Sequence, residues 1–277
     1  MNSEMTYQNP ERVLIKNDLP FYEEILDFFH KITQVKKLCK DELERAIEPL
    51  RLDEALIVAK TKNGFPLLDK EALPLEYPVL KNYFLNLLEI AGSRVQDETD
   101  RISAALSSGE MVFEEALRDV IKEEGLYARQ ELLTFLLSET IKPLLEVYAG
   151  EFKDRLKHVS WSWGYCPVCG GDPFLGVVRH EQGTRYLVCA ACATEWIFPR
   201  VKCPFCETTN HDSLWYYMAS GDERCRVEIC EECKHYIKTI DQRKLAHQES
   251  LLVQNIKTLH LDMVVGEKGY IGKVFVI

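Results

Sequence analysis

Four Cys-x-x-Cys pairs constrain this 277-residue chain more than any other feature of its sequence. They are, in chain order, Cys166 with Cys169, Cys189 with Cys192, Cys203 with Cys206, and Cys230 with Cys233. The first two pairs are separated by 19 residues and the last two by 23, a length that suits a hairpin in each half. Two tight turns of this kind can present four sulfurs to one tetrahedral ion. The spacing therefore predicts two four-cysteine metal sites with one ion in each.

Zinc and iron are the candidate metals, since both accept four thiolates in a tetrahedron. The consecutive hairpins favour consecutive pairing of the motifs, while an interleaved arrangement, in which the first and third pairs share an ion, stays open. Each unit has roughly 40 residues, too few to fold by apolar burial alone. Metal binding is therefore expected to supply much of the folding free energy of this region.

Two other uses of paired cysteines fit the sequence less well. A disulfide framework is typical of small secreted domains, whereas this chain is long and starts without a secretory signal, so we expect a reducing cytoplasmic location. A redox dithiol usually follows a strand and opens a helix in a βαβ unit. No such pattern surrounds any of the four pairs, which favours metal ligation.

The residue after each pair bears on the shape of the turn. Gly170 follows the first pair and can adopt the left-handed conformation that directs backbone amides toward the sulfurs. Ala193, Glu207 and Lys234 stand at the equivalent positions of the other turns, which argues against the same geometry at all four. The ligands themselves are unaffected by this difference.

Residues 1–160 contain a single cysteine, Cys39, and are expected to form an all-helical domain. Apolar residues recur at helical spacing over 21–32, 43–50, 77–91, 112–121 and 127–149. Pro143 is expected to kink or split the last of these helices. Neither an acid–base pair nor a nucleotide-binding loop stands out among the stripes, so we expect a scaffold and not an enzyme.

Short runs rich in β-branched and aromatic residues follow, over 174–178, 185–188, 195–198, 214–217, 227–229 and 236–240. They predict two zinc-ribbon β modules, at 161–202 and 203–247, each with one four-cysteine site. Helical spacing returns over 251–267, within a C-terminal helix and tail at 248–277. The predicted fold class is therefore α+β, with an all-α domain first, two tandem β modules next and a helix last.

Composition and charge exclude several classes of function. Apolar residues make up 46% and charged residues 28%, and the apolar runs are far shorter than a membrane span, so no membrane insertion is expected. The chain carries 34 Lys and Arg against 44 Asp and Glu, and residues 166–241 carry 8 against 11. Two divalent ions with eight thiolates would add a charge of about −4 to that region. Such a module is poorly suited to nucleic acid, whose phosphates are bound by basic side chains.

The segments around the cysteines resemble the formate dehydrogenase accessory proteins of the FdhE family. These segments read CPVCGGDP from Cys166, GTRYLVCAACATEW from Gly183, RVKCPFC from Arg200 and EICEECKHYIK from Glu228. A tail segment, Leu261–Asp262 through Glu267–Tyr270, extends the match, whereas the first 160 residues match only in length and helical character.

The resemblance implies a cytoplasmic accessory protein for maturation or quality control that binds the catalytic subunit of a molybdenum- or tungsten-dependent formate dehydrogenase. It also implies two rubredoxin-like modules in which the eight paired cysteines are the metal ligands. Seven further positions recur in the family and are candidates for the partner surface or, alternatively, for bracing the modules, for instance through a Glu195–Arg200 pair. They are Arg185, Tyr186, Glu195, Trp196, Arg200, Tyr236 and Lys238.

Two alternative functions follow from the metal sites themselves. Iron held by four thiolates can change valence, which would suit an electron carrier or a redox sensor. A zinc ribbon can also bind nucleic acid, although the charge of this region argues against it.

Overall fold

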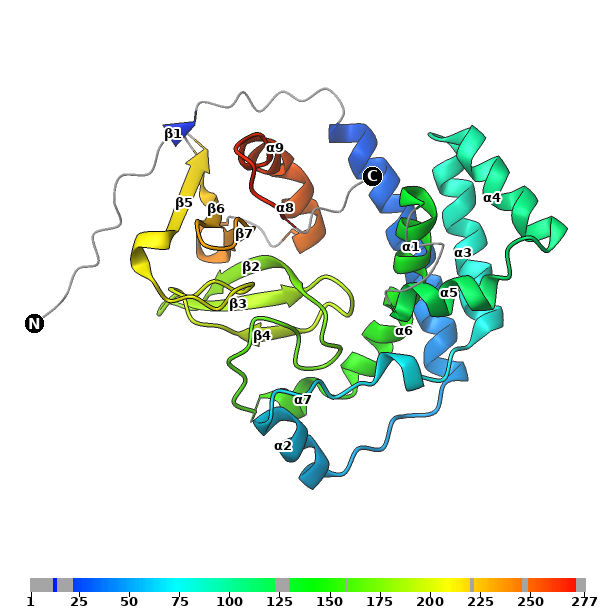
Figure 1. Ribbon diagram of the computed structural model, residues 1–277, viewed down its shortest axis with the longest axis horizontal. Coiled ribbons are helices and arrows are strands. Elements are labelled where there is room, and N and C mark those ends of the chain that lie inside the picture. The colour runs from blue at the N-terminus through cyan, green and yellow to red at the C-terminus, as the bar shows by residue number, and fades with distance from the viewer. Residues whose placement is uncertain are drawn as a thin grey trace, which may run out of the picture.

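The computed structural model describes residues 12–13, 22–122, 130–157, 159–219, 222–245 and 249–272. A helical region comes first, a β-sheet follows, and two helices end the described chain (Figure 1), so the α+β fold class is confirmed. The first helices are α1 (Tyr22–Ala46), α2 (Glu54–Lys62), α3 (Tyr77–Gly92), α4 (Gln96–Ser108), α5 (Phe113–Lys122), α6 (Glu131–Gly150) and α7 (Lys153–Leu156). The strands are β1 (Arg12–Val13), β2 (Pro173–Arg179), β3 (Thr184–Cys189), β4 (Glu195–Ile197), β5 (Leu214–Ala219), β6 (Asp222–Cys230) and β7 (Tyr236–Asp241). Helices α8 (Leu251–Lys257) and α9 (Leu259–Glu267) come last.

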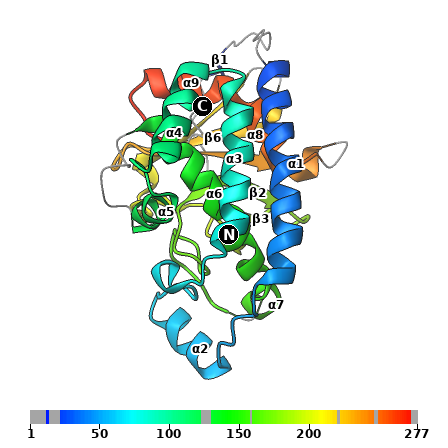
Figure 2. The same ribbon diagram turned by 90° about the vertical axis from the view of Figure 1, so that its right-hand side faces the viewer.

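Helices α3 and α6 form the centre of the helical region. Pro78 lies in the first turn of α3, where its missing N–H costs no hydrogen bond, and the helix buries Leu80, Phe84 and Leu87. Helix α6 is buried around much of its circumference, and it packs against α1, α3 and α5 (Figure 2). An apolar surface of this extent must be covered by other elements, which explains the central place of α6.

Several helices differ from the expectation. The segment predicted at 21–32 and the first half of the one predicted at 43–50 belong to one helix, α1, because nothing between them breaks the helix, and α1 ends at Ala46. Pro143 lies inside α6 without splitting it, since burial of the surrounding apolar residues offsets the lost backbone hydrogen bond. The helix predicted at 251–267 is broken at Thr258, whose hydroxyl bonds back to the Gln254 and Asn255 carbonyls. Helices α2 and α4 and the strand β1 were not predicted.

The two predicted β modules share one seven-stranded sheet with the order β1-β5-β6-β7-β2-β3-β4. Strands β2, β3 and β4 form one antiparallel meander, and β5, β6 and β7 form the other. The two meanders join through parallel pairing of β2 with β7, in which Leu175 lies opposite Lys238 and Val178 opposite Asp241. Backbone hydrogen bonds between β2 and β7 therefore join the two modules into one continuous sheet.

Two apolar cores hold these layers together. The larger core contains the buried faces of α1, α3, α5 and α6 and continues into the first cysteine region, where Cys166, Val168 and Trp196 belong to it. The smaller core lies between the sheet and the last helices, with Val177, Val227 and Leu261 among its members (Figure 1). Helix α8 also contacts α1, so it bridges the sheet and the helical region (Figure 2).

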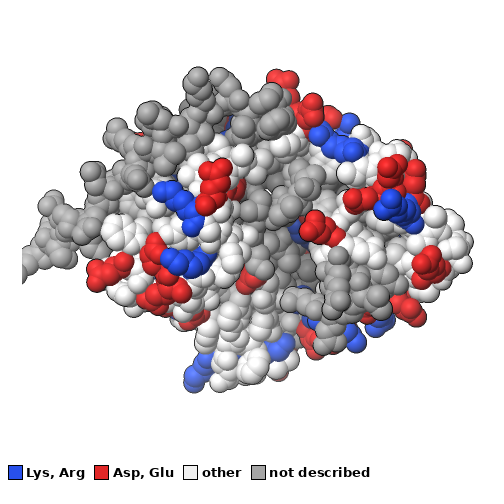
Figure 3. All heavy atoms as spheres, turned by 45° about the horizontal axis from the view of Figure 1, so that its top comes forward, with Lys and Arg blue, Asp and Glu red and all other residues white. Residues whose placement is uncertain are grey.

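Helix length and the distribution of surface charge bear on membrane and nucleic-acid binding. Within the described residues, no helix is long and apolar enough to cross a bilayer. On the face shown in Figure 3, acidic and basic side chains lie interspersed, so that face carries no broad basic patch. A basic patch is the usual electrostatic mark of nucleic-acid binding.

Candidate metal centres

The structure gathers the eight paired cysteines into two groups of four. Cys166, Cys169, Cys189 and Cys192 form the first group, and the second contains Cys203, Cys206, Cys230 and Cys233. Within each group all four sulfurs lie within 4.8 Å of one another. Pairing of the motifs is thus consecutive, and the interleaved arrangement is excluded.

The distances between sulfurs suit one ion per group. In the first group Sγ of Cys166 lies 3.5 Å from that of Cys192, and Sγ of Cys169 lies 3.4 Å from that of Cys189. The corresponding distances in the second group are 3.7 Å for Cys203–Cys233 and 3.6 Å for Cys206–Cys230. A zinc ion bonded to four sulfurs at about 2.3 Å places them about 3.8 Å apart in a regular tetrahedron. The residues therefore fit a tetrahedral metal ion at both positions.

The four turns that carry these cysteines share one backbone geometry. Gly170, Ala193, Glu207 and Lys234 all adopt left-handed φ values, of 73°, 55°, 62° and 58°. The expectation that the three non-glycine turns would differ from the first is therefore wrong. Left-handed backbone is unfavourable for residues with a Cβ atom, so other interactions must hold these three turns in place.

Backbone hydrogen bonds supply part of that support. The amides of Val168, Ala191 and Phe205 point at the sulfur two residues earlier, at 3.4, 3.3 and 3.4 Å. The first cysteine of each turn also donates its amide to the carbonyl five residues later, as Cys189 does to Thr194 at 2.9 Å and Cys203 to Thr208 at 3.0 Å. The bonds to carbonyls close the turn, and the amides that point at the sulfurs stabilise negative charge there.

Electrostatics explains why the sulfurs need a cation. Burial raises the pKa of the Cys166 thiol well above its ordinary value, and burial also raises that of Cys203. Four thiolates packed this closely in a poorly solvated site would repel one another strongly. A bound divalent ion removes this penalty, because it takes up the charge of the thiolates directly.

The two sites differ in their access to solvent. All four cysteines of the first site are buried, none more than 3% exposed. The loop after α2 lies against this site, where the amides of Leu67 and Leu68 bond to the carbonyls of Pro167 and Val168 at 3.0 and 2.8 Å. In the second site Cys203 and Cys230 are buried, but Cys206 is exposed and Cys233 is half-buried. The sequence carried no signal for this difference.

Of the seven candidate partner-surface residues, four are buried. Trp196 donates its indole N–H to the Trp163 carbonyl, and Tyr236 and Lys238 both bond to Asp262 of α9, at 2.9 and 2.5 Å. Arg185 is only 1% exposed. Burial of these four favours a bracing role for them.

The remaining three lie nearer the surface. Tyr186 and Glu195 are half-buried, and Arg200 is exposed. Glu195 pairs with Arg179 in the structure, not with Arg200 as we had suggested. Arg200 is therefore the best placed of the seven to reach a partner.

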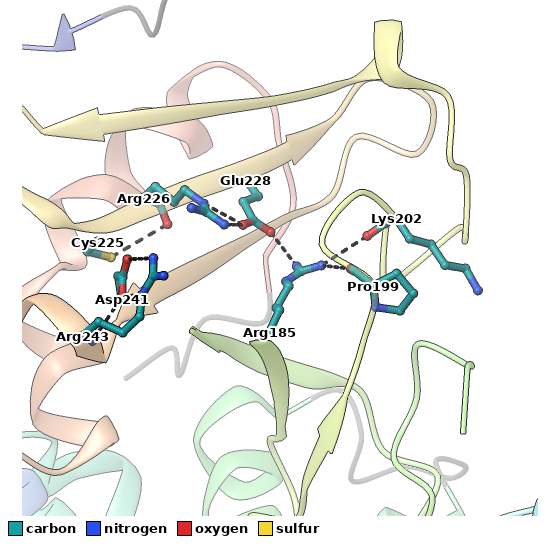
Figure 4. Close-up of polar contacts among 8 residues, drawn as sticks. All are labelled: Arg185, Pro199, Lys202, Cys225, Arg226, Glu228, Asp241 and Arg243. Atoms are coloured by element: carbon teal, nitrogen blue, oxygen red, sulfur yellow. Dashed lines mark hydrogen bonds and ion pairs between the residues drawn. The ribbon is translucent and has the colours of Figure 1, made fainter. Parts of the chain in front are cut away.

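Arg185, which is buried, links the two metal modules through an ionic cluster with the half-buried Glu228 and Arg226 (Figure 4). Its guanidinium group donates to the carbonyls of Pro199 and Lys202, at 3.0 and 3.3 Å, and to Glu228 Oε2 of β6 at 2.5 Å. Arg226 bonds to the other oxygen of Glu228 at 2.7 Å. Burial would raise the pKa of Glu228, but the two arginines outweigh burial and hold its pKa below the ordinary value.

Glu228 and Arg226 are functional candidates that no metal-binding motif in the sequence marks. Their spacing is the one sequence feature that could have indicated an ion pair, because two residues of opposite charge at positions i and i+2 of a strand lie on the same face.

Comparison with known proteins agrees with this architecture. Residues 165–200 match the family model described as FdhE, central domain, and residues 201–275 match FdhE, C-terminal domain. Over residues 165–275 the chain is similar to the FdhE family. It is 29% identical to the FdhE homolog of Aquifex aeolicus, in an alignment that spans 93% of this chain and 89% of that protein. It is 37% identical to the FdhE homolog of Stutzerimonas stutzeri over 38% of this chain and 35% of that protein.

The fold of this chain also has a counterpart among solved structures. The crystal structure of the FdhE protein from Pseudomonas aeruginosa matches it with a TM-score of 0.55 over 96% of both chains. Sequence identity in that match is 20%, so the likeness concerns the fold. The match includes the helical region, for which the sequence had shown only length and helical character in common with the family.

Proposed function

We propose that this chain is a cytoplasmic, non-enzymatic accessory protein that binds the catalytic subunit of a molybdenum- or tungsten-dependent formate dehydrogenase during maturation or quality control. The observation that carries the proposal is the presence of two closed four-cysteine sites in a chain that is similar to the FdhE family over residues 165–275. A metal held by four protein sulfurs has no open coordination position for a substrate, which favours binding over catalysis.

The eight paired cysteines would hold the two ions, and the ions would fix the modules around them. Such sites contribute folding free energy directly, because the unfolded chain has no preformed site. Arg185 and Glu228 would then hold the two modules in one orientation and present a rigid surface to the client.

A binding measurement tests this function. The full-length protein, purified without oxygen, should retain the catalytic subunit in a pull-down, and a strain lacking the protein should lose formate oxidation. Normal formate oxidation in that strain, together with no association in the pull-down, would rule the proposal out.

A redox function is the second candidate, and the exposure of Cys206 favours it. Iron in a site of four thiolates can change valence, and an exposed ligand shortens the path for electron transfer to a partner. Elemental analysis and an absorption spectrum separate the two functions. Iron with visible absorption that bleaches on reduction would support the redox function, whereas a colourless protein with two zinc ions per chain would exclude it.

A further inference from the structure

A pocket of about 500 Å³ lies beside the second metal site. One wall is the loop that joins β4 to the third cysteine pair, at 200–205, and the floor is formed by β5 and β6. Its volume is in the range of pockets that bind small ligands or a few residues of a peptide. The metal site contributes to its lining through Cys203 and Cys230.

The end of the pocket near the metal is apolar and aromatic. The rings of Phe205 and His235 stack with their centroids 4.9 Å apart, and Leu214, which lies opposite Cys230 in the sheet, is also in the lining. Flat and branched apolar groups of this kind bind an aromatic or large aliphatic side chain.

The other end of the pocket is cationic. Arg185 and Arg226 both pair with Glu228 (Figure 4), so this cluster carries one net positive charge, and the exposed Arg200 on the facing loop adds another. Lys202, also in the lining, pairs with Glu207 at 3.1 Å and adds no net charge. Besides Glu228, the lining contains one carboxylate, Asp212, in the turn just before Leu214. A carboxylate would be attracted to this end.

The two ends are separated along β6. Cys230, Glu228 and Arg226 are every second residue of β6, so their side chains share one face of the sheet. Four residues of strand span about 13 Å, so the cationic end lies well away from the negatively charged metal site. This separation matches a few residues of extended chain better than it matches a compact anion.

Backbone groups at the pocket also disfavour a phosphate ligand. Phosphate sites usually employ free backbone amides, often at the start of a helix. Here the amide of Phe205 points at Cys203 Sγ at 3.4 Å, and that of Glu207 donates to the Cys203 carbonyl at 3.1 Å. The guanidinium groups of Arg200 and Arg226 and the ring faces of Phe205 and His235 suit a carboxylate next to an apolar side chain.

We infer that this pocket binds an extended acidic segment of the client protein, with a carboxylate near Arg200 and Arg226 and an apolar side chain against Phe205 and His235. The inference rests on the proposed function, because it assigns the client's docking site. Binding of this kind requires that the acidic and the apolar side chain of the client segment be a few residues apart.

Charge reversal at Arg200 tests the inference. The Arg200→Glu variant of the metal-loaded, full-length protein should bind the catalytic subunit about tenfold more weakly than the wild type and with a weaker dependence on salt. Arg101→Glu, an exposed position on α4, is the matched control and should bind like the wild type. Metal content and circular dichroism of both variants should equal those of the wild type.

An array of overlapping peptides from the catalytic subunit identifies the segment. The peptides bound by the wild type should carry Asp or Glu within four residues of an aromatic or large aliphatic residue. Exchange of that acidic residue for Arg should abolish binding to the wild type and restore binding to Arg200→Glu.

Three results would overturn the inference while leaving the proposed function standing. They are full-strength client binding by Arg200→Glu, selection of basic peptides by the wild type, and binding of ATP or GTP that Arg200→Glu loses. Failure of the wild type to bind the catalytic subunit would instead contradict the proposed function itself.

Discussion

At the scale of single residues, Arg185 shows how a charge can be kept inside this fold. Its side chain is 1% exposed, and its guanidinium group has acceptors in two separate parts of the chain, the 199–202 loop and β6. A buried ion pair is a weak source of stability compared with apolar packing. Removal of one partner is costly, however, because the other charge is left in a poorly solvated place.

Replacing Arg185 by alanine should therefore lower the free energy of unfolding by about 3–5 kcal/mol. Urea unfolding of the metal-loaded protein measures the change, with Arg101→Ala as the exposed control. Arg185→Lys should recover only part of the loss, because an ammonium group cannot reproduce the fork of bonds to Pro199, Lys202 and Glu228. A change below about 1 kcal/mol for alanine would show that the cluster does not brace the modules.

Cys39 allows a second prediction at this scale, about reactivity. Burial in the helical core raises the pKa of its thiol to about 12, so at pH 8 almost none of it is thiolate. Because the thiolate is the reactive form, iodoacetamide at pH 8 should leave Cys39 unmodified in the native protein and modify it in urea. Peptide mapping by mass spectrometry distinguishes Cys39 from the other cysteines. Rapid modification in the native state would show that this part of the core opens readily.

At the scale of elements, the cysteine turns show that metal-site geometry can override the preference of individual residues. Ala193 is exposed and holds a left-handed conformation that costs a residue with Cβ about 1–2 kcal/mol. Alanine is not a residue type from which a left-handed conformation would be predicted. The conformation is imposed by the bonds of the turn and by the need to bring two sulfurs to one ion.

Ala193→Gly should consequently stabilise the protein by up to about 1 kcal/mol, measured by thermal or urea unfolding of the metal-loaded protein. Gly170→Ala is the opposite test, since φ there is 73° and the new Cβ would lie 3.0 Å from Pro66 Cγ. That variant should be less stable than the wild type. Equal stability of all three proteins would mean that the turns relax once the substitution is made.

The same scale shows where sequence patterns were informative. The β-branched and aromatic runs located β2 to β5 and β7 to within two residues, because half-buried strands require such side chains. Strand β6 begins at Asp222, five residues before the predicted run at 227–229. Helix α4 was missed because its sequence is mostly polar and only Thr99 and Ile102 are buried. The eight cysteines were identified from spacing alone, whereas the order of the strands, the exposure of Cys206 and the pocket depend on contacts between segments far apart in the chain.

At the scale of the whole molecule, the two metal sites stand in different surroundings. The first site is part of the core that also contains the helices, while the second has an exposed and a half-buried ligand. Loss of the first ion would disturb both the helices and the sheet, whereas loss of the second would mainly affect the β5–β7 meander.

Chelation should therefore remove the ions one at a time. In zinc-loaded protein, a chromogenic chelator should take up about one equivalent quickly and the second much more slowly, with helical circular dichroism falling only in the slow phase. Cys206→Ser should accelerate the fast phase and leave the slow one unchanged. Simultaneous release of both ions would indicate that the sites open as one unit.

The place of β7 in the sheet has a consequence for synthesis on the ribosome. One edge of β2 pairs with β3, and the other edge pairs with β7, which lies some sixty residues later in the chain. The first meander therefore leaves the ribosome with the second edge of β2 unpaired. Unpaired edges of this kind recruit other strands, including those of neighbouring nascent chains. The interval between translation of β2 and of β7 is therefore the period in which this chain is most exposed to misassembly, and slower elongation across residues 180–240 would lengthen it.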